Sequence, residues 1–201
     1  LVRWFEGQIR PMKGWATGLT GTLSGNTRAA HAFFDNDGSG WAVFATHTNL
    51  YAHDGTTLDT ITPAGFVSGH ADTSQWTLDN FGEILIACND STDKIYEYTL
   101  DGGGDATILT NAPDASAAFV TEERIIVAIG ADGNPRKVKW SDQEARTTWT
   151  ASATNQAGDL NLTTNGIGMC GGRIWGGGLI WTTDDIHLMR YLGQPDIYGI
   201  E

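Results

Sequence analysis

Residues 75–110 carry the sequence QWTLDNFGEILIACNDSTDKIYEYTLDGGGDATILT, and this stretch decides the fold. It contains four apolar runs that are rich in β-branched and aromatic residues and too short for helices. The runs lie at residues 75–78, 84–88, 95–98 and 106–109. Turn-forming residues, including a triplet of glycines, separate them. The stretch therefore predicts a four-stranded antiparallel meander.

The same unit occurs three more times along the chain. Its apolar runs lie at 31–34, 41–44, 49–52 and 58–61, then at 118–120, 125–129, 137–140 and 147–150, and finally at 167–170, 179–182, 187–191 and 196–198. Equivalent third-strand positions are Tyr51, Tyr96, Val138 and Leu188, which are separated by steps of 45, 42 and 50 residues. A period of this length with four strands per repeat indicates an all-β protein built from β-propeller blades.

We expect two parts in the chain. Residues 29–201 should form four blades, at about 29–63, 75–112, 117–152 and 166–201. Residues 1–28 should form a strand, at 1–7, and a loop, and this strand finds no partner in its own segment. We therefore expect it to pair elsewhere as a ring-closing segment, and the four blades to be a sector of a larger propeller. The inserts at 62–74 and 151–165 should be surface loops that reach a neighbour.

Composition restricts the classes of partner. The chain has 201 residues and a formal net charge of −12, so its surface repels nucleic acid phosphates and anionic lipid unless basic residues cluster in space. No apolar stretch is long enough for a membrane span, so we expect none. The two cysteines, Cys88 and Cys170, lie on predicted buried strands and should be core residues. Their spacing indicates neither a disulfide framework nor a zinc site.

One segment has the alternating oxygen groups of a calcium loop. Asp35, Asp37 and Ser39 lie around a glycine and form a candidate calcium site. The EF-hand pattern needs an acidic residue at its twelfth position, which is Thr46 here, and helices on both sides. A hairpin turn is therefore the better interpretation, and we expect neither a bound metal nor another cofactor.

The sequence predicts no catalytic site. A glycosidase needs two facing carboxylates, and sialidase-type enzymes add a cluster of arginines, but the arginines do not recur at one position of the repeat. No nucleophile elbow, P-loop or dinucleotide fingerprint is present. Residues 140–149 partly match the Asp-box of sialidase-type propellers, which is a folding element rather than a catalytic one. A carbohydrate-binding or sialidase-like propeller remains the alternative function.

Several landmarks appear in an order that resembles a known family. They are Val2-Arg3-Trp4 with Gly7, Gly14-Trp15, Arg28-Ala29-Ala30-His31, Gly55 before Ile61-Thr62-Pro63, Lys139-Trp140-Ser141-Asp142 with Trp149-Thr150, Asn155-Gln156-Ala157-Gly158-Asp159, and Ile180-Trp181-Thr182-Thr183 before Met189-Arg190-Tyr191-Leu192-Gly193. Together they span nearly the whole chain. They resemble the propeller-containing virion structural proteins of tailed bacteriophages, of the tail nozzle type.

The resemblance implies a structural role without catalysis. It implies a homo-oligomeric ring at the tail tip, assembled in the host cytoplasm, in contact with other tail proteins such as the adaptor and the fibres. Phage DNA would pass through the lumen during ejection without specific binding, and an acidic lumen would suit that passage. Members of such families are usually longer, so the resemblance also implies that this chain is a fragment.

Overall fold

A computed structural model of the chain describes residues 2–11, 18–67, 74–100 and 102–201. Regular structure in these residues consists of β-strands and one short 3-10 turn, η1 (Ala131–Gly133). Sixteen of the strands form four four-stranded sheets, one in each predicted repeat unit, which we call blades 1 to 4. In chain order these strands are β3 (Thr27–Phe34), β4 (Gly40–Thr46), β5 (Leu50–His53), β6 (Leu58–Thr60); β7 (Trp76–Phe81), β8 (Ile84–Asn89), β9 (Lys94–Thr99), β10 (Thr107–Ile108); β11 (Ala117–Val120), β12 (Ile126–Ile129), β13 (Lys137–Trp140), β14 (Gly158–Asn161); β15 (Gly168–Ile174), β16 (Gly177–Thr182), β17 (Ile186–Tyr191), β18 (Tyr198–Ile200).

Each blade is an antiparallel meander whose strands lie side by side in sequence order. Strands of this composition pair with their sequence neighbours because tight turns join them. One position in the strand pairing of β16 with β17 requires glycine. Gly177 has a φ of 158°, and a Cβ at this position would lie 1.9 Å from the carbonyl oxygen of Met189. Strand order within the blades is therefore as the sequence predicts.

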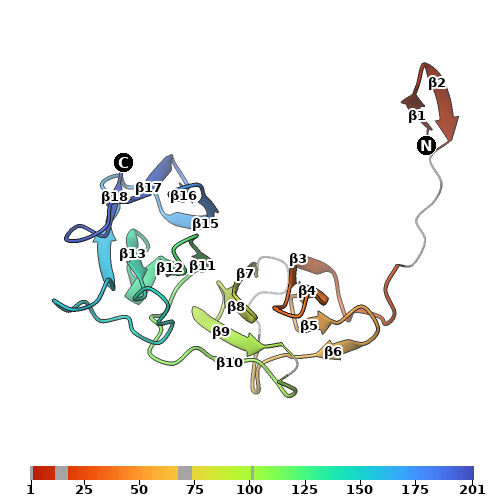
Figure 1. Cartoon of the computed structure of the whole chain (residues 1–201), viewed down its shortest axis with the longest axis horizontal. Helices are drawn as coiled ribbons and strands as arrows, with labels where there is room; N and C mark the ends of the chain where they lie inside the picture. The colour runs from red at the N-terminus through yellow and green to blue at the C-terminus, as the bar shows by residue number, and fades with distance from the viewer. Residues whose placement is uncertain (1, 12–17, 68–73, 101) are drawn as a thin grey trace.

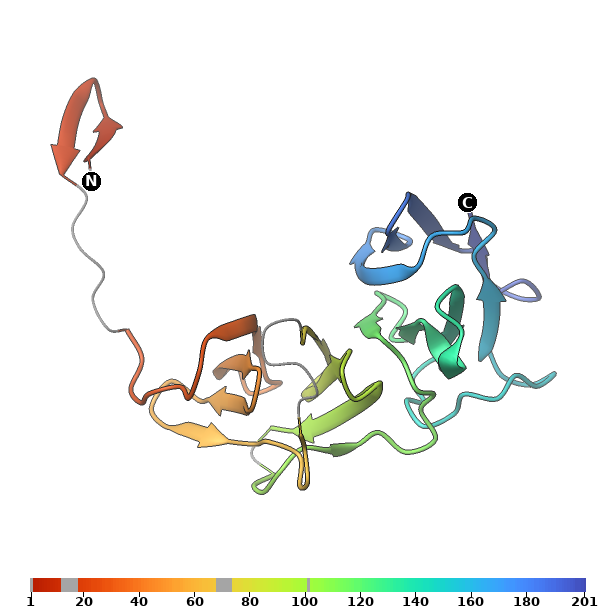
Figure 2. The same ribbon diagram turned by 180° about the vertical axis from the view of Figure 1, so that it is seen from behind.

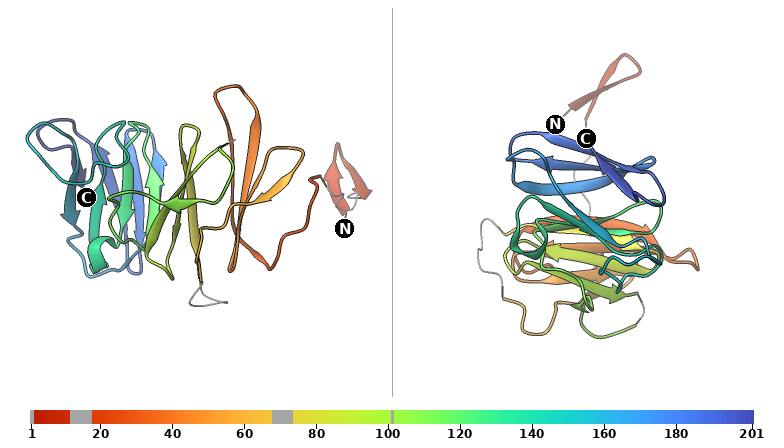
Figure 3. Two further views of the ribbon diagram at one scale, coloured as in Figure 1. Left: turned by 90° about the horizontal axis from the view of Figure 1, so that it is seen from below. Right: turned by 90° about the vertical axis from the view of Figure 1, so that its left-hand side faces the viewer.

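The four blades follow one another along an open arc (Figures 1 and 2). The first strands of successive blades, β3, β7, β11 and β15, contact one another in turn, so they form the inner side of the arc. The fourth strands lie on the outer side. In the left view of Figure 3 the strands of the four blades lie along roughly one axis and alternate in direction, so the turns lie at two rims.

Three apolar clusters fill the junctions between neighbouring blades. Strand β8 contributes side chains to two of these clusters. Leu85 and Ala87 pack toward blade 1, whereas Ile86 and Cys88 pack toward blade 3. Strand β12 is buried on both faces in the same way. Because side chains alternate along a strand, a continuous apolar run serves two junctions at once. This agrees with the sequence-based expectation of strands sandwiched between blades.

Side chains of β7 accept hydrogen bonds from backbone N–H groups at the inner edge of β11, where no other strand pairs. The Thr77 hydroxyl accepts a hydrogen bond from the Ala118 backbone N–H at 2.9 Å, and the buried Asp79 carboxylate accepts one from the Val120 N–H at 2.8 Å. An innermost strand has no strand partner on that side, and its buried N–H groups need acceptors. The contacts also fix the relative position of blades 2 and 3.

The N-terminal segment differs from the expectation. The first strand, β1 (Val2–Phe5), pairs with β2 (Gln8–Pro11) in a two-stranded hairpin that Figure 1 draws apart from the blades. The prediction that this strand lacks a partner in its own segment was wrong, because a two-residue turn at Glu6 and Gly7 lets the chain fold back at once. Both turn residues have positive φ, at 50° and 74°, as such turns require. Strand β1 therefore has a hydrogen-bonded partner strand without closing a ring.

Blade 3 also differs, in its fourth strand. That strand is β14 (Gly158–Asn161), which pairs with β13 and occupies part of the predicted loop 151–165, whereas residues 147–150 form no strand. The reason is packing: Trp149 is buried in the junction between blades 2 and 3, and its indole N–H donates to the Arg146 carbonyl at 2.8 Å. Blade 3 therefore extends to residue 161 rather than 152.

The other insert, 62–74, is described at residues 62–67 and 74. Within this part Phe66 packs on blade 2, with its ring centroid 5.1 Å from that of Trp76 and 6.2 Å from that of Tyr96. Phe66 therefore turns back onto the sheet, whereas Val67 beside it is 77% exposed. The remainder of the insert, residues 68–73, lies outside the described residues, and with it the expectation that this loop reaches a neighbour.

Candidate functional site

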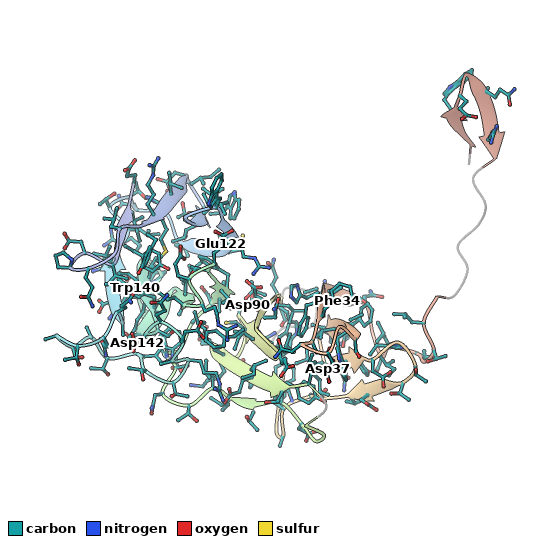
Figure 4. The ribbon with its side chains drawn as sticks, viewed as in Figure 1. Phe34, Asp37, Asp90, Glu122, Trp140 and Asp142 are labelled. Carbon is teal, nitrogen blue, oxygen red and sulfur yellow. The ribbon has the colours of Figure 1, made fainter. Side chains whose placement is uncertain are left out.

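The candidate calcium loop is a hairpin turn between β3 and β4. The two carboxylate oxygens of Asp35 accept hydrogen bonds from the Ser39 N–H at 2.8 Å and the Trp41 indole N–H at 3.3 Å. The turn is also closed by a backbone bond from the Gly38 N–H to the Asp35 carbonyl at 3.1 Å. Asp37 is exposed on the same turn (Figure 4). Among the described residues, no three His, Cys, Asp or Glu side chains lie close enough together to hold a metal ion.

The segment with partial Asp-box character connects β13 to β14. The Asp142 carboxylate accepts from the backbone N–H groups of Gln143 and Gln156, at 2.9 and 2.8 Å, while Ser141 is fully buried and accepts from the Ile126 N–H. Asp142 and Trp140 lie on the outer part of blade 3 (Figure 4). These contacts hold a long turn against the blade, which is a folding role.

The structure brings together one carboxylate–arginine set that the sequence analysis missed. Arg146 Nε donates to Glu97 Oε2 at 2.5 Å, and both residues line a polar hollow of about 250 Å³ with Asp105. The signal was hidden because Arg146 lies in the long β13–β14 turn, 49 residues from Glu97. The hollow lies beside the outer strands rather than at the centre of the arc. Since Glu97 already pairs with the guanidinium, this site lacks a free cation for an acidic sugar.

A second polar cluster surrounds His187, which is buried. Its Nε2 lies 3.0 Å from the Thr164 hydroxyl and 3.2 Å from Asp185 Oδ1. Hydrogen bonds from Thr182 and then Thr164 hold the pKa of Asp185 below its ordinary value. Both partners approach the same ring nitrogen. The cluster fastens the loop before blade 4.

The innermost strands carry few charges. Their charged residues are Arg28 on β3, the buried Asp79 on β7 and Arg173 on β15, and β11 has none. The acidic residues near the arc, such as Asp90 and Glu122 in Figure 4, lie at turns. The expected acidic lumen therefore depends on the rims and not on the strands that face inward.

The outer face of blade 4 is apolar, and the described residues leave much of it open. Side chains on this face come from alternate positions of β15, β16 and β17, which the strand register aligns. They are Cys170, Ile174, Leu179, Trp181, Ile186 and Leu188, together with Arg190. Trp181 is 37% exposed and Ile186 58% exposed. In blades 2 and 3 the equivalent face is buried by the next blade, so we call this set the blade-4 face.

Cys170 corrects another expectation. Cys88 is buried, as the sequence predicts, but Cys170 is exposed on the blade-4 face. The two cysteines occupy similar strands, and the difference is that no described blade follows blade 4. Burial strongly raises the pKa of the Cys88 thiol, and the nearby Asp93 and Asp90 carboxylates add to this effect.

An open groove lies at the end of the blade-4 face. It has a volume of about 470 Å³ and is lined by Ile174, Trp175, Gly176, Leu188, Arg190, Tyr191 and Leu192. Trp175, in the β15–β16 turn, is 93% exposed. The side chain of Arg190 is exposed as well and has no hydrogen-bond or ion-pair partner among the described residues. A large exposed apolar surface beside an unpaired cation is a candidate binding site.

Blade 1 has the other terminal face. Phe34 is 74% exposed on it, at the end of β3, next to the small side chains of Ala30 and Ala32. The outer half of this face is covered by residues 18–26: the Ser24 N–H donates to the Tyr51 hydroxyl at 3.1 Å, and the Thr20 hydroxyl lies 3.4 Å from His53 Nε2. The inner half, around Phe34, stays open in the described residues. We call it the blade-1 face.

Comparison with known proteins bears on the fold. The sequence matches no family model and no curated protein. Among solved structures, the chain is similar to one titled "YCF48 bound to D1 peptide", with a TM-score of 0.56 and 12% sequence identity. YCF48 is a propeller. The fold is a β-propeller.

The match covers 91% of this chain and 56% of the YCF48 chain, so this chain spans little more than half of that protein's length. Separately, no helix in the described part of the chain is long and apolar enough to cross a membrane.

Proposed function

We propose that this chain is a structural, non-enzymatic component of a bacteriophage tail, a nozzle-type protein that forms a homo-oligomer around the DNA exit channel. The observation that carries the proposal is the exposed apolar surface at the rim of blade 4, where Trp175 in the β15–β16 turn is 93% exposed. A surface with Trp181, Ile186 and the neighbouring Trp175 exposed is typical of an assembly interface. A building block of a particle needs such a surface to contact its neighbours.

The sequence resemblance supports the same conclusion, because its landmarks span nearly the whole chain. The surface charge fits as well: a net charge of −12 limits adhesion of phosphate backbones that pass nearby. Assembly would take place in the host cytoplasm, with the adaptor and fibre proteins of the tail as further partners. In the mature virion the protein would then contact DNA only transiently.

Purified virions test the proposal. Particles from the phage that carries the gene should contain the protein in several copies at the tail, as seen by mass spectrometry and by particle reconstruction. A nonsense mutation in the gene should give particles that do not eject DNA, and supply of the protein from a plasmid should restore ejection. Absence of the protein from purified wild-type particles would refute the proposal.

Glycan binding without turnover is the second candidate function. One observation favours it: Trp175 offers an exposed ring in a groove that also contains Arg190 and Tyr191. Exposed aromatic rings stack on sugar faces, and an arginine can pair with the carboxylate of an acidic sugar. A glycan array would test it, with Trp175→Ala expected to abolish any binding that depends on this groove. No binding to any glycan of the array would remove this candidate.

A further inference from the structure

The outermost strand of blade 2, β10, has an open edge on the outer side of the arc (Figure 1). It pairs with β9, and no described strand pairs with its other side. The Leu109 N–H donates to the Ile95 carbonyl at 2.9 Å, so these two residues form a hydrogen-bonded pair. Such pairs alternate along an antiparallel ladder, so the backbone N–H and C=O of Ile108 point away from β9. Ile108 is 57% exposed, and these two groups have no partner among the described residues.

Blade 1 already uses this edge at one position. The Ala106 N–H, two residues before Ile108, donates to the Ile61 carbonyl at 2.9 Å. This bond confirms that even-numbered positions of the β10 segment point their backbone groups outward. The edge therefore binds extended backbone at Ala106 and leaves the next outward position, Ile108, open.

An apolar hollow of about 420 Å³ lies on one face of this edge. Phe66, Tyr96, Ala106 and Ile108 contribute to its lining. Ile108 lies directly opposite Tyr96 in the strand register, so the two side chains share a face of blade 2. Tyr96 and Ala106 belong to the apolar cluster between blades 1 and 2, so the hollow is on the blade-1 side.

The other face of the same edge is polar and acidic. Thr107 lies opposite Glu97, and both line the hollow of about 250 Å³ that also contains Arg146 of blade 3. Glu97 is already paired with Arg146. Asp105 in the same hollow is exposed and has no hydrogen-bond or ion-pair partner in the described part of the chain. With Asp59 it lines a neighbouring hollow of about 330 Å³. The negative charge here is therefore not compensated.

A strand added to β10 would place its side chains alternately on these two faces, because side chains alternate along a strand. A residue opposite Ile108 would share the face of Tyr96 and reach the apolar hollow. Its two sequence neighbours would lie on the face of Thr107, where the Asp105 carboxylate is free. An apolar residue between two basic residues therefore matches both faces.

We infer that the outer edge of blade 2 binds an extended peptide segment of a partner protein, in which an apolar residue is flanked by lysine or arginine. The N–H and C=O of Ile108 bond to the backbone of the segment, the apolar side chain occupies the hollow beside Phe66, and a flanking cation pairs with Asp105. In strand addition, main-chain bonds provide affinity and the pockets for alternate side chains provide specificity. Blade 2 lies between two described blades, so this site does not depend on what covers blades 1 and 4.

A synthetic peptide with blocked ends, Thr-Lys-Leu-Lys-Thr, tests the inference on the complete chain. Carrying a fluorescein label, it should give saturable binding in fluorescence anisotropy over a protein concentration series. Replacement of leucine by serine, or of both lysines by glutamate, should weaken binding about tenfold or more. Methylation of the leucine backbone nitrogen should weaken it to a similar extent, because it removes the donor for the Ile108 carbonyl while the side chain stays the same.

Variants of the protein locate the site. Ile108→Pro removes the outward N–H and leaves the Leu109 bond to β9 in place, since proline is tolerated on strand edges whose N–H faces solvent. It should weaken binding of the peptide about tenfold or more. Asn161→Pro is the matched control on β14, the outermost strand of blade 3. The Leu162 N–H donates to the Arg136 carbonyl, so the Asn161 N–H also points outward. This change should leave binding unaltered.

Asp105→Asn should also weaken binding, whereas Asp184→Asn, at an exposed turn of blade 4, should not. Circular dichroism checks that each variant remains folded. Absence of saturable binding would overturn the inference. So would binding that persists with the methylated peptide or with Ile108→Pro, and so would equal binding of the glutamate peptide. Absence of the protein from purified virions would remove the proposed phage role and leave this site unaffected, because the inference goes beyond that role.

Discussion

At the scale of single residues, the blades are joined by a few polar side chains that replace missing strand partners. Asp79 is the clearest example, because its carboxylate accepts from the N–H of Val120 on the next blade and from the N–H of Asn80 on its own strand. A buried N–H group without an acceptor costs about 1–3 kcal/mol. The polar contacts therefore contribute to the geometry of the arc as well as to its stability.

We predict that Asp79→Ala lowers the free energy of unfolding by about 1–3 kcal/mol, because it leaves the Val120 N–H unpaired. Urea titration followed by tryptophan fluorescence measures the effect. Asp79→Asn keeps an acceptor oxygen and should cost less. Asp184→Ala, at an exposed turn, is the control and should change stability by no more than about 0.5 kcal/mol. Equal stability of the two alanine variants would contradict the role of Asp79.

The two thiols should differ in reactivity. Cys170 is exposed and Cys88 is fully buried, with the pKa of its thiol raised strongly by desolvation. At low protein concentration we expect a thiol reagent to label one cysteine per chain, and Cys170→Ser to abolish this labelling. In denaturant, both thiols should react. Labelling of Cys88 in the native protein would show that the junction between blades 2 and 3 opens readily.

Acid should weaken one surface cluster on blade 3. Hydrogen bonds from Lys137 and then Lys139 hold the pKa of Asp132 below its ordinary value of 3.8. A carboxyl whose pKa is lower in the folded state stabilises the fold above the unfolded pKa, and this stability is lost as pH falls through the folded value. Asp132 is 38% exposed, so the loss should stay below about 1 kcal/mol. Urea titrations between about pH 5 and pH 2 should show a smaller decline for Asp132→Asn than for the wild type.

At the scale of elements, the junction between blades 3 and 4 depends on glycines of β15. A Cβ on Gly171 would lie 2.6 Å from the Phe119 ring and 2.8 Å from Ile129, whereas a Cβ on Gly172, one residue further, would meet nothing closer than 3.9 Å. Adjacent positions of one strand thus face a packed junction and an open surface. Alanine substitutions at these two positions therefore separate the effect of packing from the effect of strand propensity.

We predict that Gly171→Ala destabilises the protein by about 1–3 kcal/mol through overpacking, while Gly172→Ala is neutral or slightly stabilising. Thermal and urea unfolding of the two variants measure the difference. Neither glycine has a positive φ, so backbone strain does not separate them. A loss of similar size in both variants would mean that the approach of Phe119 to β15 is not as close as the structure has it.

At the scale of the whole molecule, the blades differ in how many of their faces are covered. Blades 2 and 3 are buried on both sides, and blade 4 is buried on one side in the described residues. Repeat proteins gain much of their stability from contacts between neighbours. The terminal blade should therefore open more often than the central ones.

Hydrogen exchange should report this difference. At low protein concentration we expect backbone amides of β16 and β17 to exchange faster than those of β8 and β12, as measured by mass spectrometry of peptides. Uniform exchange in all four blades at low concentration would mean that a covering partner is not needed to stabilise blade 4.

The sequence by itself determined the blades. Short runs of apolar residues between turn formers, repeated about every 45 residues, leave few alternatives to sequential antiparallel meanders. The doubly apolar runs at 84–88 and 125–129 even indicated which strands lie between two junctions. These features are local, because alternation along a strand and turn chemistry are properties of neighbouring residues.

Only the tertiary structure decided how the segments between the runs are used. Trp149 looked like part of a strand, but burial between two blades removes it from the sheet and leaves β14 to pair at residues 158–161. The burial of Cys88 and the exposure of Cys170 follow from what lies across each strand, which no local pattern records. The pairing of Arg146 with Glu97 likewise depends on a contact between residues far apart in the chain. Local patterns predict the strands, whereas the burial or exposure of a strand face depends on whether another element packs against it.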